Sequence, residues 1–189
     1  MNNKINVKRN TKFMVIAAML AAISTILSFI EVPFIVPHLK LDFSEVPTLI
    51  GGIMLSPLYA LAICLVKNAL HLFVTSTFGI GELMNFIVGI SISLPIALIF
   101  NKFRKTMSMK KSIWVSALIT LPIAVITGLL ANVIFYPVFI NLMGGKIESS
   151  AVFITYLLST IPMNIVKYVL TTVLVCPMIP ILKKYKFAS

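Results

Sequence analysis

The feature that most constrains this chain is a series of long apolar runs, each near or above the roughly 20 residues that an α-helix needs to cross a bilayer. The runs are continuous and do not alternate apolar with polar positions, so strands are not expected. Hydrophobic residues make up 59% of the chain and the mean hydropathy is +1.05. A water-soluble domain of 189 residues could not bury that much apolar surface. The sequence predicts an all-α integral membrane protein.

The runs define six transmembrane helices within a single domain, 1–189. The run 13–30 forms the first helix, and since no small-residue cleavage site follows it, we expect a span and not a signal peptide. The run 46–76 is too long for one span and is interrupted at Ser56-Pro57, so it predicts two short helices. The remaining helices are predicted at 82–100, at 113–140 with kinks at Pro122 and Pro137, and at 151–182.

Basic residues orient the predicted helices. The chain carries 16 Lys and Arg against 5 Asp and Glu, a net charge of +11. Most of these cations lie in the segments 1–12 and 101–112 and at Lys183, Lys184 and Lys186. Cytoplasmic ends of membrane helices carry such an excess, so nucleic acid is not the expected partner. Six helices place all three segments in the cytoplasm, whereas five would leave one outside. We therefore expect a multi-pass protein of the cell membrane whose loops 31–45, 77–81 and 141–150 face out.

The segment 40–59 combines a polar edge with an apolar run. Lys40, Asp42 and Glu45 come first, and ionisable groups at the edge of a membrane segment are costly unless water or a ligand reaches them. Gly51 and Gly52 follow within the apolar part. Paired glycines allow close approach of a neighbouring helix or of a flat ligand.

Other polar residues within the helices fall in their outer halves or near the midplane, which predicts a pocket open to the exterior. Asn164 and Lys167 share one face near the middle of the last helix. A lysine at that depth needs an acceptor, either a carboxylate such as Glu82 or Asp42, or ligand oxygens, and we expect a functional role for it. Glu82 has an alternative, which is to pair with a lysine such as Lys40.

Several polar residues have structural interpretations. Asn68 and His71 are expected to bridge helices more than to bind a ligand, although His71 shares a face with Lys67. Cys64 and Cys176 are expected to be small core residues. Four loop residues are expected to be solvated: Glu31, His38, Lys146 and Glu148.

The motifs of catalysis and metal binding are missing from the sequence. It contains no GxSxG, no HExxH and no paired aspartates within helices. The GGK at 144–146 lacks the upstream spacing of a phosphate-binding loop, and the two histidines are far apart. We expect no enzyme activity, no metal site and no cofactor.

The first predicted helix carries a stripe of small residues. Ala17 and Ala21 lie on one line, and Ala18 and Ala22 lie beside it. Small residues four apart allow helices to pack backbone to backbone. The partner helix is either within this chain or in another protein.

Taken together, these segments resemble a known family over essentially the whole chain. The basic N-terminus, the alanine stripe, LDFSEVPTLIGGIMLSPLYAL, KNALHLFVTSTFGIGELMNF and NIVK are similar to the substrate-binding S components of energy-coupling-factor (ECF) vitamin transporters. The resemblance is closest to the riboflavin-specific member. It implies a six-helix protein that captures a vitamin from outside and works with a transmembrane coupling subunit and two ATPase subunits. The alanine stripe would then contact the coupling subunit.

Riboflavin is uncharged, with a flat ring system and a polar ribityl chain. Apolar residues such as Leu41, Phe43, Leu83 and Met84 would flank the ring, while amides and a lysine would bind the polar atoms. The candidate ligand-binding residues are Lys40, Leu41, Asp42, Phe43, Glu45, Thr48, Glu82, Leu83, Met84, Asn85, Asn132, Asn164 and Lys167.

Alternative functions stay open. Another vitamin could use similar amides, and an ion-coupled carrier is possible, although it would usually need half-helices or an inverted repeat at the midplane. An intramembrane enzyme is disfavoured because no nucleophile and base are paired.

Overall fold

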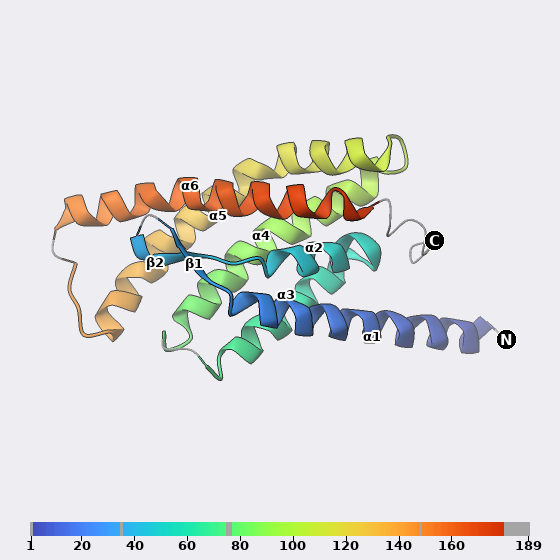
Figure 1. Cartoon of the computed structure of the whole chain (residues 1–189), viewed down its shortest axis with the longest axis horizontal. Coiled ribbons are helices and arrows are strands. Elements are labelled where there is room, and N and C mark those ends of the chain that lie inside the picture. The colour runs from blue at the N-terminus through green and yellow to red at the C-terminus, as the bar shows by residue number, and fades with distance from the viewer. Residues whose placement is uncertain (1, 35, 75–76, 148, 180–189) are drawn as a thin grey trace.

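The computed structural model describes residues 2–34, 36–74, 77–147 and 149–179, with side chains except at 2–9 and 36–39. Within these residues the elements are α1 (Asn2–Ser28), β1 (Val32–Phe34), β2 (Val36–Leu41), α2 (Glu45–Met54), α3 (Pro57–His71), α4 (Ile80–Phe103), α5 (Met109–Leu142) and α6 (Ser150–Val175). Figure 1 shows the helices packed side by side along one long axis. The predicted all-α fold of six helices is confirmed.

In the described part of the chain, four helices are long and apolar enough to cross a membrane, namely α1 from Asn10 onward, α4, α5 and α6. The run 46–76 contains two shorter helices, as predicted. Ser56 separates them in an extended conformation, and Pro57 occupies the first turn of α3, where its missing N–H costs no hydrogen bond. The expected kink residues Pro122 and Pro137 lie within α5.

The loop 31–45 contains a two-stranded antiparallel hairpin, so the expectation of no strands was wrong for this segment. Val32 pairs with Leu41, and Pro33 pairs with Lys40. The expectation came from the membrane spans, whereas the hairpin lies between two of them. Prolines in both strands favour extended backbone at the residues that precede them, which suits a short ribbon outside the helices.

The two ends of the bundle differ in charge. In Figure 1 the start of α1 and the α4–α5 connection lie at one end, and the hairpin and the α5–α6 connection lie at the other. The α4–α5 region carries Lys102, Arg104, Lys105, Lys110 and Lys111. The expected cytoplasmic and outer loops are therefore separated in space. Glu148 and the residues from 180 onward, including the end of the last predicted helix and Lys183, Lys184 and Lys186, lie outside the described residues.

Helix α2 is buried along most of its length, and its paired glycines serve helix packing. A Cβ at Gly52 would lie 2.9 Å from the Cβ of Ala97 in α4 and 3.0 Å from that of Ala60 in α3. Gly51 packs against the side chains of Ile63 and Leu20. Close approach of neighbouring helices, and not of a ligand, explains both positions.

The alanine stripe of α1 divides into two faces. Ala17 and Ala21 are buried and belong to a cluster with Leu55 and Ile63, so their partner is within the chain. Ala18 and Ala22 are exposed. The expected interface with another protein therefore needs correction, because only the exposed pair remains available for it.

Candidate functional site

A cavity of about 520 Å³ lies at the end of the bundle that holds the hairpin, away from the basic α4–α5 connection. Its walls come from the last residues of α1, the hairpin, the end of α3, the beginning of α4, the end of α5 and the part of α6 from Tyr156 to Lys167. Because successive helices alternate in direction, these parts meet on one side of the membrane. Small-molecule pockets usually measure about 300–1,000 Å³, so the cavity suits a ligand of vitamin size.

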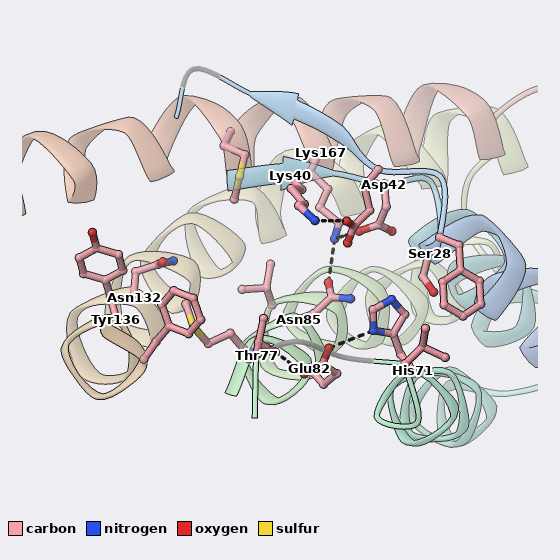
Figure 2. Close-up of a pocket in the computed structure, with 18 of the residues that line it drawn as sticks. Ser28, Lys40, Asp42, His71, Thr77, Glu82, Asn85, Asn132, Tyr136 and Lys167 are labelled. Carbon is pink, nitrogen blue, oxygen red and sulfur yellow. Dashed lines mark hydrogen bonds and ion pairs between the residues drawn. The ribbon is translucent and has the colours of Figure 1, made fainter. Parts of the chain in front are cut away.

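Lys167 is the central polar group of this cavity. Its ammonium donates to Asp42 Oδ2 and to Asn85 Oδ1, each at 2.9 Å, and its side chain is only 4% exposed. Figure 2 shows these three residues meeting from α6, from the segment after β2 and from α4. The expectation that a carboxylate such as Asp42 reaches Lys167 is confirmed.

Asp42 is held as a carboxylate. The backbone N–H of Ser44 donates to its Oδ1 at 2.8 Å, and the Ser44 hydroxyl donates to the same oxygen. Burial raises the pKa of Asp42, but the ammonium groups of Lys167 and Lys67 and the Ser44 hydroxyl outweigh burial and hold that pKa well below its ordinary value. The group next to Lys167 is therefore a fixed negative charge.

A second ion pair lies behind the first and outside the cavity. Lys67 and Glu45 are fully buried, with Lys67 Nζ 2.6 Å from Glu45 Oε1. Lys67 also donates to Ser44 Oγ at 2.9 Å, and Lys167 Nζ lies 3.8 Å from the same Glu45 oxygen. A Cβ at Gly89 would lie 2.5 Å from that oxygen, so only glycine leaves room for the carboxylate against α4. The sequence indicated no partner for Lys67, because 22 residues separate it from Glu45.

Glu82 pairs with His71, which corrects the expectation of a pair with Lys40. Glu82 Oε1 lies 2.9 Å from His71 Nδ1, and Thr77 Oγ1 donates to Glu82 Oε2 at 2.7 Å. Lys40 pairs instead with Glu31. His71 is the last residue of α3 and Glu82 lies in the first turn of α4, while the hairpin brings Lys40 back to the start of its first strand.

His71 bridges helices as expected, and its ring also stacks on Phe29 with the centroids 5.0 Å apart. Asn68 does not bridge, because its amide donates to Cys64 O of the same helix at 2.8 Å. Cys64 is buried, as expected of a core residue, and Cys176 is half-buried. Glu31 and Lys146 are exposed, as expected of solvated loop residues, and Glu31 also pairs with Lys40. The side chain of His38 lies outside the described residues.

An aromatic wall forms another side of the cavity. Tyr136 of α5 and Tyr156 of α6 stack with their ring centroids 3.6 Å apart. The Tyr156 hydroxyl donates to Asn132 Oδ1 at 2.9 Å, and the Asn132 amide donates to Gly128 O. In Figure 2 Asn132 and Tyr136 lie on one side, Ser28 and His71 on the other, and Lys167, Asp42 and Asn85 between them. The cavity therefore joins flat aromatic surface to a central group of donors and acceptors.

Seven of the predicted binding residues line the cavity: Lys40, Asp42, Glu82, Met84, Asn85, Asn132 and Lys167. Six others lie elsewhere: Leu41, Phe43, Glu45, Thr48, Leu83 and Asn164. Leu83 is 45% exposed on the outer surface of α4, and Thr48 is buried and donates to Ser44 O. Asn164 is buried against Gly128 of α5. Sharing a helix face with Lys167 was thus not enough to bring Asn164 to the wall.

Most of the apolar residues that line the cavity, and both of its tyrosines, were not predicted from the sequence. Their residue types do not distinguish a cavity wall from a lipid-facing surface, although tyrosines inside a membrane helix could have been weighed for their hydroxyls. The missed lining residues are Ser28, Phe29, Glu31, His71, Val74, Thr77, Gly81, Val88, Tyr136, Phe139, Ile140, Met143, Tyr156 and Met163. Among the described residues, no group of three or more His, Cys, Asp or Glu is placed to hold a metal ion.

The chain is similar to known transport proteins over nearly its whole length. Residues 12–179 match the family described as ECF transporter, substrate-specific component. Riboflavin transporter RibU of Staphylococcus aureus (strain TCH60) is 27% identical over 172 residues, which cover 90% of this chain and 89% of the relative. Riboflavin transporter FmnP of Bacillus subtilis (strain 168) is 28% identical over 169 residues, 86% of this chain and 87% of the relative.

A solved structure shares the fold. It is described as the structure and mechanism of the S component of a bacterial ECF transporter, and it superposes with a TM-score of 0.77 at 26% sequence identity. The match covers 93% of this chain and 98% of the other.

Proposed function

The chain belongs to the family of substrate-specific components of ECF transporters, and from that premise we propose that its outer cavity binds riboflavin. Proteins of this family are membrane-spanning transport components that pair with the ECF module in the cell membrane, and they are not enzymes. The two curated relatives named as riboflavin transporters support riboflavin as the vitamin. Their identity to this chain is below 30%, so the substrate has to be argued from the site.

The observation that carries the proposal is the combination of surfaces in one cavity. A ring system with polar edges and a hydroxylated chain needs a flat apolar slot beside clustered donors and acceptors. The Tyr136 and Tyr156 rings offer the aromatic surface, and Lys167 with Asn85 offers the polar centre. A volume of about 520 Å³ accommodates a molecule of that size.

Within this arrangement the ring system lies among the apolar lining residues, including Met84, Val88 and Met163. The ribityl hydroxyls and ring-edge atoms bond to Lys167, Asn85 and Asn132. Lys40 and Lys167, which both line the cavity, are each already paired with a carboxylate. That pairing suits an uncharged ligand better than an anion.

After the ligand has bound, its movement across the membrane would require the assembled ECF complex. In the proposed role the chain captures riboflavin from outside and passes it on with a transmembrane coupling subunit and two ATPase subunits. Ala18 and Ala22, on the exposed side of α1, are the proposed contact with the coupling subunit.

The absorption spectrum of detergent-purified protein tests the ligand directly. Co-purified riboflavin would give the visible band of an oxidised flavin, and titration of the ligand-free protein would quench flavin fluorescence to saturation at one site. Loss of both signals in folded protein would remove riboflavin as the substrate. Saturable binding of a different vitamin would then keep the family role and change only the ligand, whereas strict dependence on an ion would favour a carrier.

A further inference from the structure

Hydrogen bonds and ion pairs connect the cavity residues Asp42 and Lys167 to a third charged residue, Lys67, which lies outside the cavity. Lys67 of α3 is fully buried and is not among the cavity-lining residues. Its ammonium nevertheless donates to Glu45 and to Ser44, which both lie next to the cavity charges. We propose that Lys67 is a positioning residue, which sets ligand affinity by holding Lys167 at the cavity wall. The inference rests on the proposed function, because it takes Lys167 as a ligand donor.

The first route from Lys67 to Lys167 passes through a shared carboxylate. Glu45 Oε1 lies 2.6 Å from Lys67 Nζ and 3.8 Å from Lys167 Nζ. While Lys67 neutralises Glu45, Lys167 is left to bond Asp42 and Asn85, both at the wall. Without Lys67, Glu45 is a buried anion whose next cation is Lys167, and attraction between such groups is strong away from water. Lys167 would turn toward Glu45 and withdraw its donors from the cavity.

The second route passes through a hydroxyl. Lys67 donates to Ser44 Oγ at 2.9 Å, so that oxygen is engaged as an acceptor. The Ser44 hydroxyl then donates its own proton to Asp42, and the other oxygen of Asp42 accepts from Lys167. Loss of Lys67 would free the Ser44 hydroxyl to rotate and would loosen Asp42, the main anchor of Lys167.

The backbone of α4 limits how far the Glu45 carboxylate can move when Lys67 is removed. The Glu45 carboxylate lies against Gly89, where even a Cβ would lie 2.5 Å from Oε1. Glu45 therefore has little space to move away from Lys167. The long and flexible Lys167 side chain is the group that adjusts when the charge balance changes.

Riboflavin affinity of four proteins tests this inference: wild type, Lys67→Met, Lys67→Met with Glu45→Gln, and Asn68→Leu. Lys67→Met should weaken binding by about tenfold or more, and adding Glu45→Gln should recover part of that loss, because the pull on Lys167 is gone while the bond from Lys67 to Ser44 stays missing. Asn68, the neighbouring buried residue, bonds within its own helix, so Asn68→Leu controls for repacking of α3. Wild-type affinity in Lys67→Met, or no recovery in the double variant, would overturn the inference.

Ligand-free thermal stability separates this inference from the identity of the vitamin. If Lys167 takes over Glu45 when Lys67 is absent, Lys67→Met and Lys167→Met together should lower Tm by more than the sum of their separate shifts. Additive shifts would overturn the inference even if riboflavin binds, and flavin binding by wild type alone decides the proposed function. Should Lys67→Met fail to fold, Gly89→Ala keeps every charge and displaces the Glu45 carboxylate. Wild-type affinity in that variant would then overturn the inference.

Discussion

Lys167 is a buried cation that is held by two hydrogen-bond acceptors and still lines the cavity. Its ammonium is neutralised by Asp42 and oriented by Asn85, yet it remains part of the cavity wall. A buried ion pair is a weak source of stability, because desolvation offsets most of the attraction. A pair of this kind at the proposed ligand site is therefore better explained by binding than by folding.

Replacing Lys167 by Met should separate these two roles. Losing a hydrogen bond to a charged group costs about 1.5–3 kcal/mol, so riboflavin affinity should fall by about tenfold or more. Stability should also fall, because Asp42 is left buried without its cation. Adding Asp42→Asn should restore stability and leave affinity low. Fluorescence titration beside the Tm of the ligand-free protein measures both, and full affinity in Lys167→Met would assign the lysine to structure alone.

The low pKa of Asp42 predicts a pH range for its contribution. Because the folded-state pKa lies below the ordinary value of 3.8, the carboxylate stabilises the fold above that value and loses its effect as pH falls through the lower folded pKa. The Tm advantage of wild type over Asp42→Asn should stay constant from about pH 8 to about pH 5 and shrink only below about pH 4. An advantage that disappears between about pH 6 and about pH 5 would mean that Asp42 is protonated more easily in the fold.

At the scale of elements, the two faces of α1 should respond differently to a bulky side chain. Ala18→Trp or Ala22→Trp adds bulk on the exposed face and would block the proposed contact with the coupling subunit. Cellular riboflavin uptake should therefore drop, while riboflavin affinity in detergent stays at the wild-type value. Ala17→Trp or Ala21→Trp would overpack the cluster with Leu55 and Ile63, so Tm should fall as well. Unchanged uptake in the Ala18 and Ala22 variants would place the partner interface on another surface.

The helices were predictable from sequence because apolar runs and prolines act locally. The two short helices on either side of Ser56-Pro57 show this, since the extended serine and the N-terminal proline need no distant contact. The hairpin was missed because its pattern is short and includes proline. The pairing of Lys67 with Glu45 depends on how α2 packs on α3, which no periodicity specifies. The same holds for Asn164, which packs on Gly128 instead of facing the cavity.

At the scale of the whole molecule, ligand capture should need no energy source. The sequence lacks a phosphate-binding loop, and no described cluster of acidic or histidine side chains is placed to hold a metal ion. Riboflavin affinity of the isolated protein should therefore be the same in sodium-containing and sodium-free buffer and with or without ATP. Titration in matched potassium and sodium buffers checks this, and an affinity that appears only with sodium would contradict the S-component role for this chain.

Because the cavity lysines are paired with carboxylates, binding of a neutral ligand should not depend on the membrane potential. Moving one elementary charge across the membrane potential involves about 2.3 kcal/mol per 100 mV. Lys40 and Lys167 each lie beside a carboxylate, and riboflavin itself is neutral, so filling the cavity transfers no net charge through the field. Capture of the vitamin should be electrically silent, and an energised cell and a de-energised one should hold it with equal affinity at this site.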